Sequence, residues 1–255
     1  MQLIAGRLTH LVWFVIFTAS LSFYIKRGRR IAELPIRRVA GLDALDEAIG
    51  RATEMGMGVH YTMGLQDFEA QTFASFEILR YTAGLTAKMD VPLIVSNYRP
   101  QVHPVTEEVV RGAYVLAGKP DAYQADNVRF LSDQQLAYAS GVVGILERER
   151  IAANLMFGNF YAESLIFAEV GQKMGCIQVT GTANTHQLPF FTAVCDYCLI
   201  GEELYAAGAY LSRNPVQVGS LMAQDVGKLL ALLFITVGTV LSSFGQKWLT
   251  DLVKK

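Results

Sequence analysis

Two uncharged apolar stretches lie near the ends of the chain. Residues 11–25 contain no charged side chain, and neither do residues 229–246. A membrane-spanning helix needs about 20 mostly apolar residues, and about 17–25 are tolerated. The second stretch is long enough by itself, and residues 8–10 can extend the first. The pattern therefore predicts two transmembrane helices, and it divides the chain into an N-terminal anchor (1–30), an α/β domain (31–227) and a C-terminal helix with a tail (228–255).

The charges that flank the first stretch indicate its orientation. Only Arg7 precedes it, whereas four basic residues follow it closely: Lys26, Arg27, Arg29 and Arg30. A cleaved signal peptide is the alternative interpretation, but it would carry its positive charge before the apolar segment. Because cytoplasmic loops are enriched in Lys and Arg, we expect an uncleaved anchor in the cell membrane, with the α/β domain facing the cytoplasm.

A buried or interfacial helix at the end of the domain is the alternative for the second stretch. If both stretches span the membrane, the tail after Trp248 lies outside the cell, and its lysines argue against that side. Gly227, Gly238 and Ser242 are small residues in or near this stretch. Small residues at helical spacing let helices approach closely in lipid, so they favour a homo-oligomer.

The middle of the chain alternates short apolar strands with longer helices. Strands are predicted at residues 59–62, 91–96, 128–131, 153–157, 176–180 and 197–200. Helices are predicted at residues 43–55, 68–87, 106–117, 132–150, 161–174 and 202–211. Short strands that are apolar on both faces and alternate with helices are typical of a parallel sheet covered on both sides. We therefore expect an α/β fold of the Rossmann-like, doubly wound type.

Polar residues at the predicted helix starts indicate how those helices are capped. Thr106 is expected to cap the helix that it begins. The pairs Ser132 with Gln135 and Asn184 with Gln187 match the capping-box pattern.

Composition adds limits to this picture. Hydrophobic residues make up 52% of the 255 residues and charged residues 18%, and the formal net charge is −1. There is no basic excess to favour nucleic acid and no acidic excess to favour disorder. The basic run after the first stretch is explained by contact with anionic lipid. Cys176, Cys195 and Cys198 all fall in apolar runs, so we expect buried reduced thiols rather than a disulfide framework.

The carboxyl ends of the predicted strands are the place to look for a site, because ligands of open parallel sheets lie there. Three successive strands end in a glycine and a polar residue: Gly158-Asn159, Gly181-Thr182 and Gly201-Glu202. The functional interpretation is a pocket for a small anionic metabolite or nucleotide, lined by Asn97, Asn159, Glu163, Thr182, Asn184 and Glu202. The structural interpretation is that turns before helices need such residues whatever the function. The sequence contains no Gly-x-Gly-x-x-Gly motif or Walker loop, and it names no cofactor.

Other patterns give weaker signals for chemistry. Cys195 and Cys198 have a redox-type spacing, but residues three apart on a strand point to opposite faces, so we do not expect a redox pair. The four histidines show no metal-ligand spacing: His10, His60, His103 and His186. In an enzyme, His186 or Glu202 would be the acid or base, but the sequence assigns no catalytic residue.

Three runs of sequence carry a resemblance to a known family. They are residues 157–164 (FGNFYAES), 181–191 (GTANTHQLPFF) and 195–207 (CDYCLIGEELYAA). Through them the chain resembles an uncharacterised family of prokaryotic membrane-anchored α/β proteins, known only as a domain of unknown function. The resemblance covers about residues 30–228 together with the flanking anchors. It implies a class of membrane protein, and it transfers no activity and no catalytic residue.

These observations leave three classes of function open. The first expectation is a membrane-anchored structural or scaffolding protein that self-associates, since the chain has two anchors and no catalytic motif. The alternative is a ligand-binding or regulatory membrane protein that uses the strand-end pocket. The second alternative is an enzyme on the same pocket. The expected partners are the lipid bilayer, further copies of the chain and, for the alternatives, a small-molecule ligand, but not nucleic acid.

Overall fold

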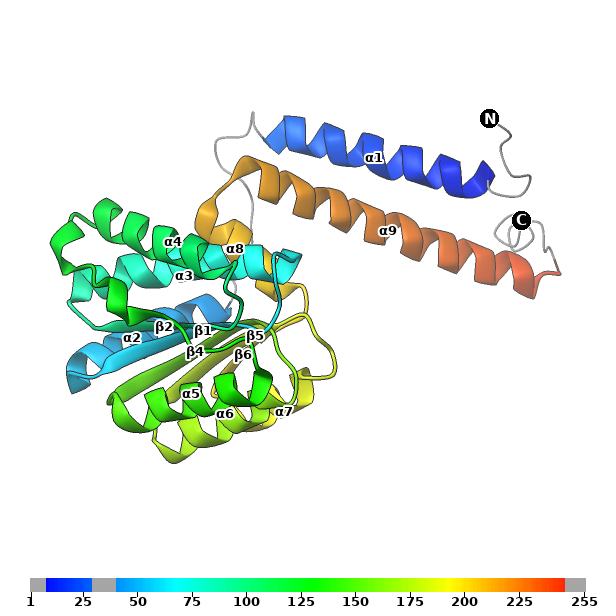
Figure 1. Cartoon of the computed structure of the whole chain (residues 1–255). Helices are drawn as coiled ribbons and strands as arrows, with labels where there is room; N and C mark the ends of the chain where they lie inside the picture. The colour runs from blue at the N-terminus through cyan, green and yellow to red at the C-terminus, as the bar shows by residue number, and fades with distance from the viewer. Residues whose placement is uncertain (1–7, 29–39, 246–255) are drawn as a thin grey trace. The chain divides into compact units, whose positions relative to one another are not determined.

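The computed structural model describes residues 8–28 and 40–245 (Figure 1). The chain forms two compact units, one from residues 37–212 and the other from residues 1–36 and 213–255. The basic residues at 29–38 and the tail after residue 245 lie outside the described residues.

The larger unit is built on a six-stranded sheet in which every neighbouring pair of strands is parallel. The strands are β1 (Gly58–Gly64), β2 (Leu93–Asn97), β3 (Val128–Phe130), β4 (Ile151–Asn159), β5 (Ile177–Thr182) and β6 (Tyr197–Ile200). Their order across the sheet is β3-β2-β1-β4-β5-β6. The order reverses between β1 and β4, so the sheet is doubly wound. The predicted α/β fold class is confirmed.

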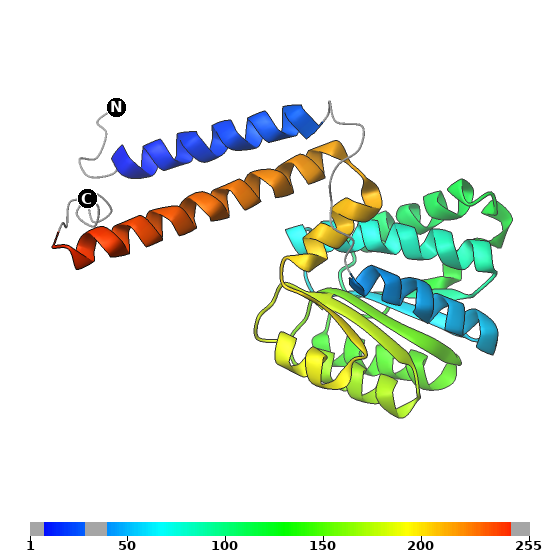
Figure 2. The same cartoon turned by 180° about the vertical axis from the view of Figure 1, so that it is seen from behind.

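Helices cover both faces of this sheet (Figures 1 and 2). One face carries α2 (Ala40–Met55), α3 (Ala70–Met89), α4 (His103–Leu116) and α8 (Glu203–Ser212). The other carries α5 (Gln135–Arg148), α6 (Glu163–Lys173) and α7 (Leu188–Val194). Two short 3₁₀ turns, η1 (Pro120–Ala122) and η2 (Ala125–Asn127), join α4 to β3. Each face has its own apolar core cluster, and therefore all residues of β1 and β2 are buried.

The helix starts differ from the predicted capping. Helix α4 begins at His103, so Thr106 lies inside it, and its hydroxyl is within hydrogen-bonding distance of the carbonyl oxygen of Val102. The Ser132 hydroxyl accepts from the backbone N–H of Gln134, which forms a turn just before α5 instead of a capping box. The Asn184 side chain likewise accepts from a backbone N–H two residues later. Ser and Asn favour such local turns as readily as caps, and the pattern alone does not separate the two.

The smaller unit is a pair of antiparallel helices, α1 (Leu8–Gly28) and α9 (Pro215–Ser243). Gly28 at the end of α1 lies against Pro215 at the start of α9, and farther along Trp13 packs edge-on against Phe234, with ring centroids 5.5 Å apart. Helix α9 starts well before the uncharged stretch that begins at residue 229, because Asn214 caps it by accepting from the Val216 N–H and Pro215 suits its first turn.

Both helices are long and apolar enough to cross a membrane. Large apolar side chains are exposed along each of them: Leu11, Val12, Phe14, Val15, Ile16, Phe17, Leu21 and Phe23 on α1, and Leu229, Leu232, Leu233, Ile235, Val237 and Val240 on α9. Glycines form much of the contact between the helices. A Cβ atom at Gly219 would lie 2.7 Å from the carbonyl oxygen of Tyr24, so only glycine permits this approach.

Candidate functional site

At the switch point, the backbones of β1 and β4 approach each other closely. Gly64, the last residue of β1, and Gly158, the next-to-last residue of β4, have φ of 82° and 143°, and a side chain on either would overlap the backbone of the other strand. Just beyond, the N–H of Leu65 donates to the carbonyl oxygen of Asn159 at 2.9 Å. Leu65 and Phe160 are both buried in the core on the α5–α7 side. The residues that directly follow β1 and β4 therefore pack into the core beside the switch point, where doubly wound folds often hold ligands.

Three of the predicted site residues come together next to this point. The Asn184 Nδ2 donates to Asn159 Oδ1 at 3.3 Å, and the Thr182 hydroxyl accepts from the Asn184 N–H at 3.1 Å. Gln71 in the first turn of α3 joins them, since its Oε1 accepts from the N–H of Ala183 at 2.9 Å. Nothing in the sequence distinguishes Gln71 from an ordinary helical glutamine. These hydrogen bonds fix the turns after β4 and β5, which supports the structural interpretation.

Glu163 holds the starts of two helices together. Its side chain is buried, with Oε2 accepting from Gln135 Nε2 at 2.7 Å and Oε1 accepting from the Tyr161 N–H at 2.7 Å. The neighbouring Ser164 hydroxyl donates to Gln187 Oε1 at 2.7 Å. The starts of α5, α6 and α7 are thereby tied side by side through hydrogen bonds that are buried or partly buried.

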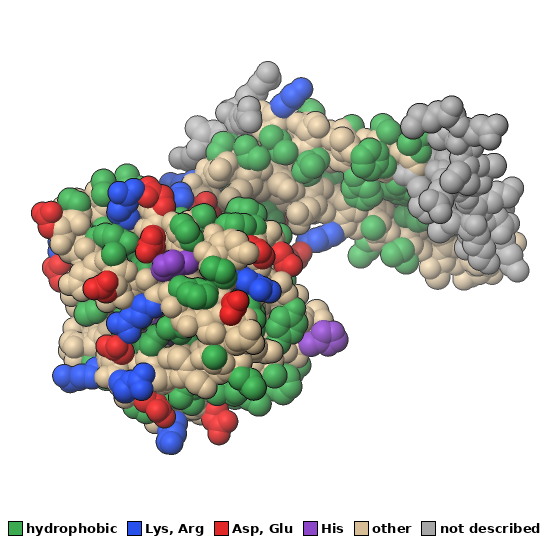
Figure 3. Space-filling view, viewed as in Figure 1, with side chains coloured by type: hydrophobic (Ala, Val, Ile, Leu, Met, Phe, Trp, Pro, Cys, Tyr) green, Lys and Arg blue, Asp and Glu red, His purple; other side chains and the backbone are tan. Residues whose placement is uncertain are grey.

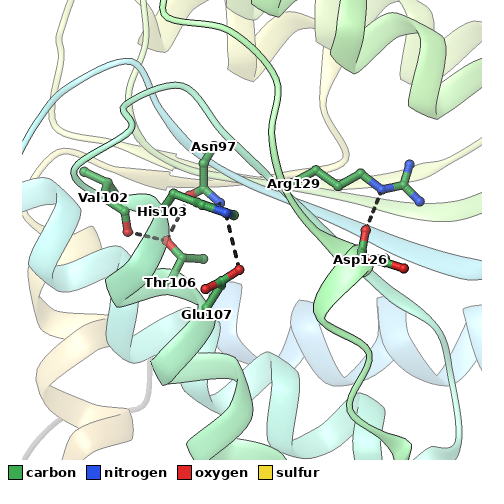
Figure 4. A network of polar contacts seen from close by, with 7 residues as sticks. All are labelled: Asn97, Val102, His103, Thr106, Glu107, Asp126 and Arg129. Carbon is green, nitrogen blue, oxygen red and sulfur yellow. Dashed lines mark hydrogen bonds and ion pairs between the residues drawn. The ribbon is translucent and has the colours of Figure 1, made fainter.

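Asn97 belongs to a separate network at the end of β2 (Figure 4). Its Oδ1 accepts from the Thr106 hydroxyl at 2.9 Å, and its Nδ2 lies 3.3 Å from His103 Nδ1. The other ring nitrogen of His103 lies 3.3 Å from a carboxylate oxygen of Glu107. Both nitrogens of this imidazole are thus engaged within the chain. In the same view, Arg129 on β3 donates to the backbone carbonyl of residue 126 at 3.0 Å.

The remaining candidates lie at the surface. Glu202 is exposed in the turn after the outer strand β6, and its carbonyl oxygen accepts from the first N–H groups of α8. The neighbouring Glu203 carboxylate accepts from the Ile200 N–H at 2.9 Å. His186 is exposed, and its backbone N–H donates to Asn184 Oδ1 at 3.2 Å. In the part of the chain that the structure describes, no three His, Cys, Asp or Glu side chains are arranged to hold a metal ion.

A cavity of about 190 Å³ lies away from all of the predicted site residues. It opens at the amino end of β2, where Asp90, Val91 and Pro92 lead into the strand, and Tyr114 and Gln124 also line it. The carboxyl edge and this cavity are at opposite ends of the sheet, so the cavity gives no support to the predicted pocket.

Sequence reasoning missed a chain of buried polar side chains that crosses four neighbouring strands. His60 on β1 lies 2.9 Å through Nδ1 from Asn154 Oδ1 on β4, and 2.9 Å through Nε2 from the Ser96 hydroxyl on β2. Asn154 Nδ2 donates to Gln178 Oε1 on β5 at 3.2 Å, and the Tyr138 hydroxyl lies 3.2 Å from that of Ser96. All five side chains are buried. The available signal was a polar residue in the middle of each apolar strand.

Burial sets the protonation state of the side chains in this hydrogen-bonded network. It lowers the pKa of His60 from 6.5 to about 4, so the imidazole is neutral near pH 7. Because Asn154 Oδ1 can only accept, Nδ1 carries the proton and Nε2 accepts from the Ser96 hydroxyl. Burial also raises the pKa of Tyr138 to about 12. Gly171 on α6 provides the space, because a side chain there would overlap Gln178 Oε1. With both ring nitrogens engaged, His60 maintains the fold and is not available as a base.

The two neighbouring cysteines do not point to opposite faces as predicted. Cys195 follows α7 as its C-cap and precedes the strand, whereas Cys198 lies on β6, so the alternation of a strand does not apply to the pair. Both side chains pack against the same core cluster, on the α5–α7 side of the sheet. Burial raises the pKa of Cys195 to about 12 and also raises that of Cys198, which keeps both thiols protonated and weakly nucleophilic.

Five large apolar side chains are exposed at or beside the first turns of α5, α6 and α7. We refer to them together as the α5–α7 surface: Leu136, Tyr161, Leu165, Ile166 and Phe190. Leu136 is 78% exposed, although it is a large apolar side chain in the first turn of a helix. Figure 3 shows that apolar side chains reach the surface of this unit as well as both long helices. Large exposed apolar patches on soluble domains often mark contacts with other molecules.

The fold and its two long helices define the class of the protein: a doubly wound α/β unit joined to two apolar helices that could span a membrane. The family described as "Domain of unknown function (DUF6754)" matches residues 2–253, and the chain belongs to this family. No curated protein and no solved structure matches the chain.

Proposed function

We propose that the protein is a membrane-anchored, self-associating structural or scaffolding protein with its α/β unit in the cytoplasm. The observation that carries the proposal is the α5–α7 surface, which exposes large apolar side chains at helix starts held together by hydrogen bonds of Glu163 and Ser164. A surface of this kind suits contact with another copy of the chain. The polar residues at the strand ends, by contrast, hydrogen-bond to one another.

The antiparallel helix pair supports the membrane topology. The α/β unit follows α1 and precedes α9 in the chain, so both of its connections come from the same end of the pair. If the helices span a bilayer, the unit lies on one side and both termini lie on the other. Lys26 and Arg27 are at the end of α1 that leads to the α/β unit, and this placement favours the cytoplasm for that unit.

The test is the mass of the full-length protein in mild detergent, measured by mass photometry and electron microscopy. A defined oligomer is expected for the unmodified chain, and Leu136→Ser combined with Phe190→Ser is expected to shift it to smaller species. The matched control is Asn159→Ala with Thr182→Ala, which changes the strand-end residues and is expected to leave the mass unchanged. A monomer for the unmodified chain would contradict self-association.

A second function has one observation in its favour. The contacts of Asn159, Thr182, Asn184 and Gln71 place four polar side chains beside the switch point, which is where doubly wound folds hold ligands. The alternative is therefore a regulatory protein that binds a small anionic metabolite or nucleotide there. It predicts thermal stabilisation of the protein by such a compound, lost in Asn184→Ala. If a screen of nucleotides and anionic metabolites shifts no melting temperature, this alternative is excluded for the compounds tested.

A further inference from the structure

The register of the helix pair places one part of α9 beside the middle of α1. A Cβ atom at Gly227 would lie 2.7 Å from the ring of Phe17, so the two residues are in direct contact. Phe17 is close to the midpoint of α1, which has 21 residues. Along the axis of the pair, Gly227 therefore lies level with the middle of α1.

Two charged residues of α9 flank this level. Asp225 and Lys228 form an ion pair, with Lys228 Nζ 3.6 Å from Asp225 Oδ1, and their side chains are 77% and 52% exposed. The buried residues of α9 are Val218, Gly219, Ala223 and Gly227, and of these Gly219 and Gly227 face α1. The charged pair thus lies on an exposed face of α9, and no other charged residue occurs in that helix.

A bilayer makes this position costly. If α1 crosses the membrane with its uncharged residues 11–25, the level of Phe17 lies within the hydrocarbon core. Asp225 and Lys228, just before the predicted stretch 229–246, are then drawn into that core, and the membrane-crossing part of α9 begins earlier than the uncharged stretch alone predicts. Ionisable side chains at that depth almost always face protein or water rather than lipid. An exposed ion pair between residues three apart contributes little by itself. The face of α9 that carries the pair is therefore expected to be covered by protein.

We propose that a second copy of the chain covers this face, with Asp225 of each copy paired to Lys228 of the other. Two parallel copies related by a two-fold axis present the same face to each other. Asp225 of the first copy then lies opposite Lys228 of the second, and Lys228 of the first lies opposite Asp225 of the second. The two positions differ in height by about 4.5 Å, which a lysine side chain can span. Any other partner would need to supply both charges itself, whereas the chain already does. This inference rests on the proposed membrane-spanning, self-associating function and names the contact within the membrane.

Coexpression of two oppositely charged variants tests the contact directly. Asp225→Lys leaves two basic residues on the face, and Lys228→Asp leaves two acidic ones. Each variant alone is expected to associate roughly tenfold more weakly than the unmodified chain, because like charges meet across the interface. Together, with different affinity tags, they are expected to form mixed complexes that survive purification on both tags in mild detergent. Absence of mixed complexes when both variants are present in the membrane fraction would overturn the proposal.

A neutral variant covers the case in which added charge prevents insertion. Asp225→Asn with Lys228→Gln inserts more easily into lipid, and it is expected to lose oligomeric mass. The matched control is the exposed pair Glu108 and Arg111 on α4, also three residues apart, where Glu108→Gln with Arg111→Gln is expected to change nothing. If the unmodified chain is a monomer, the proposed function itself fails. If it is an oligomer whose mass the neutral variant retains, only the contact through Asp225 and Lys228 is wrong.

Discussion

Polar side chains have different surroundings in the interior of the α/β unit and on the outer face of the helix pair. In the sheet, His60, Asn154 and Gln178 are buried and each has hydrogen-bond partners from the same chain. On α9, Asp225 and Lys228 form a pair that stays exposed on a helix otherwise suited to lipid. Buried polar groups whose hydrogen bonds are all made within the chain hold the fold together. Charged groups exposed on an apolar helix point to contacts with something else.

The largest loss of stability is expected from removing the Asn154 amide, which lies at the centre of the buried hydrogen-bonded network. Asn154→Leu leaves the His60 N–H and the Gln178 Oε1 contact without their partner in the core. Each buried polar group left unpaired costs about 1–3 kcal/mol, so a loss of about 2–6 kcal/mol is expected. Hydrogen exchange in β1 and β4 of the full-length protein in detergent measures it. Gln124→Leu, at an exposed amide, is the control, and equal protection in both variants would break the comparison.

A pH dependence of the same region is expected from His60. Above pH 6.5 the imidazole is neutral in both the folded and the unfolded chain. Between pH 6.5 and about 4 the unfolded chain binds a proton that the folded chain does not, because burial lowers the folded pKa to about 4. Stability therefore falls as the pH is lowered through this window, by about 3 kcal/mol. Unfolding of the unmodified chain and of His60→Gln, compared from pH 8 to 4, isolates the effect, and parallel curves would refute it.

A smaller effect is expected from closing the space between the two long helices. In Gly219→Val the added atoms would meet the backbone of Tyr24 and Ile25, which cannot move as a flexible side chain would. A loss of about 1–3 kcal/mol in helix pairing is expected. Disulfide formation between cysteines introduced at Trp13 and Phe234 reports the pairing. The control is Gly84→Ala on α3, where a Cβ atom meets nothing within 4 Å. Unchanged cross-linking in Gly219→Val would show that the close approach is not required.

The smallest effect is expected at the strand-end residues. Thr182→Val removes a hydroxyl that accepts from the Asn184 N–H and lies near Gln71. The cost is about 1 kcal/mol if the residue only shapes the turn. Thermal unfolding of the full chain measures it, with Thr192→Val on the exposed face of α7 as the control. A variant that keeps its stability but loses stabilisation by an added anion would instead favour the ligand-binding alternative.

Much of the fold could be predicted from the sequence, because short apolar strands and helical spacing are local signals. The strand at 197–200 is found where it was expected, and the other strands differ by a few residues at their ends. The order of the strands could not be predicted, since it depends on contacts between distant segments. Helix α9 also starts earlier than the uncharged stretch indicates, because its cap at Asn214 precedes a polar first half.

The site was predicted less completely than the fold. The sequence placed Asn159, Thr182 and Asn184 near one another because parallel strands end at the same edge, and the structure brings them into contact. The sequence could not show that Glu163 and Asn97 lie outside this group, because their hydrogen-bond partners come from neighbouring helices. The buried hydrogen-bonded network around His60 was missed because its residues are far apart in sequence. His60 and Asn154 are separated by 94 positions.

The hydrogen bond from the Ile200 N–H to the Glu203 carboxylate limits how copies of the chain can join. β6 is one of the two outer strands of the sheet, and without this bond the Ile200 N–H could donate to a strand from another molecule. Such a strand would have to displace the carboxylate, and two β6 strands would bring two negative charges together. Pairing of β6 with a strand of another molecule is thereby opposed at this edge of the sheet. Under the proposed self-association, copies would then meet through side-chain surfaces rather than along β6.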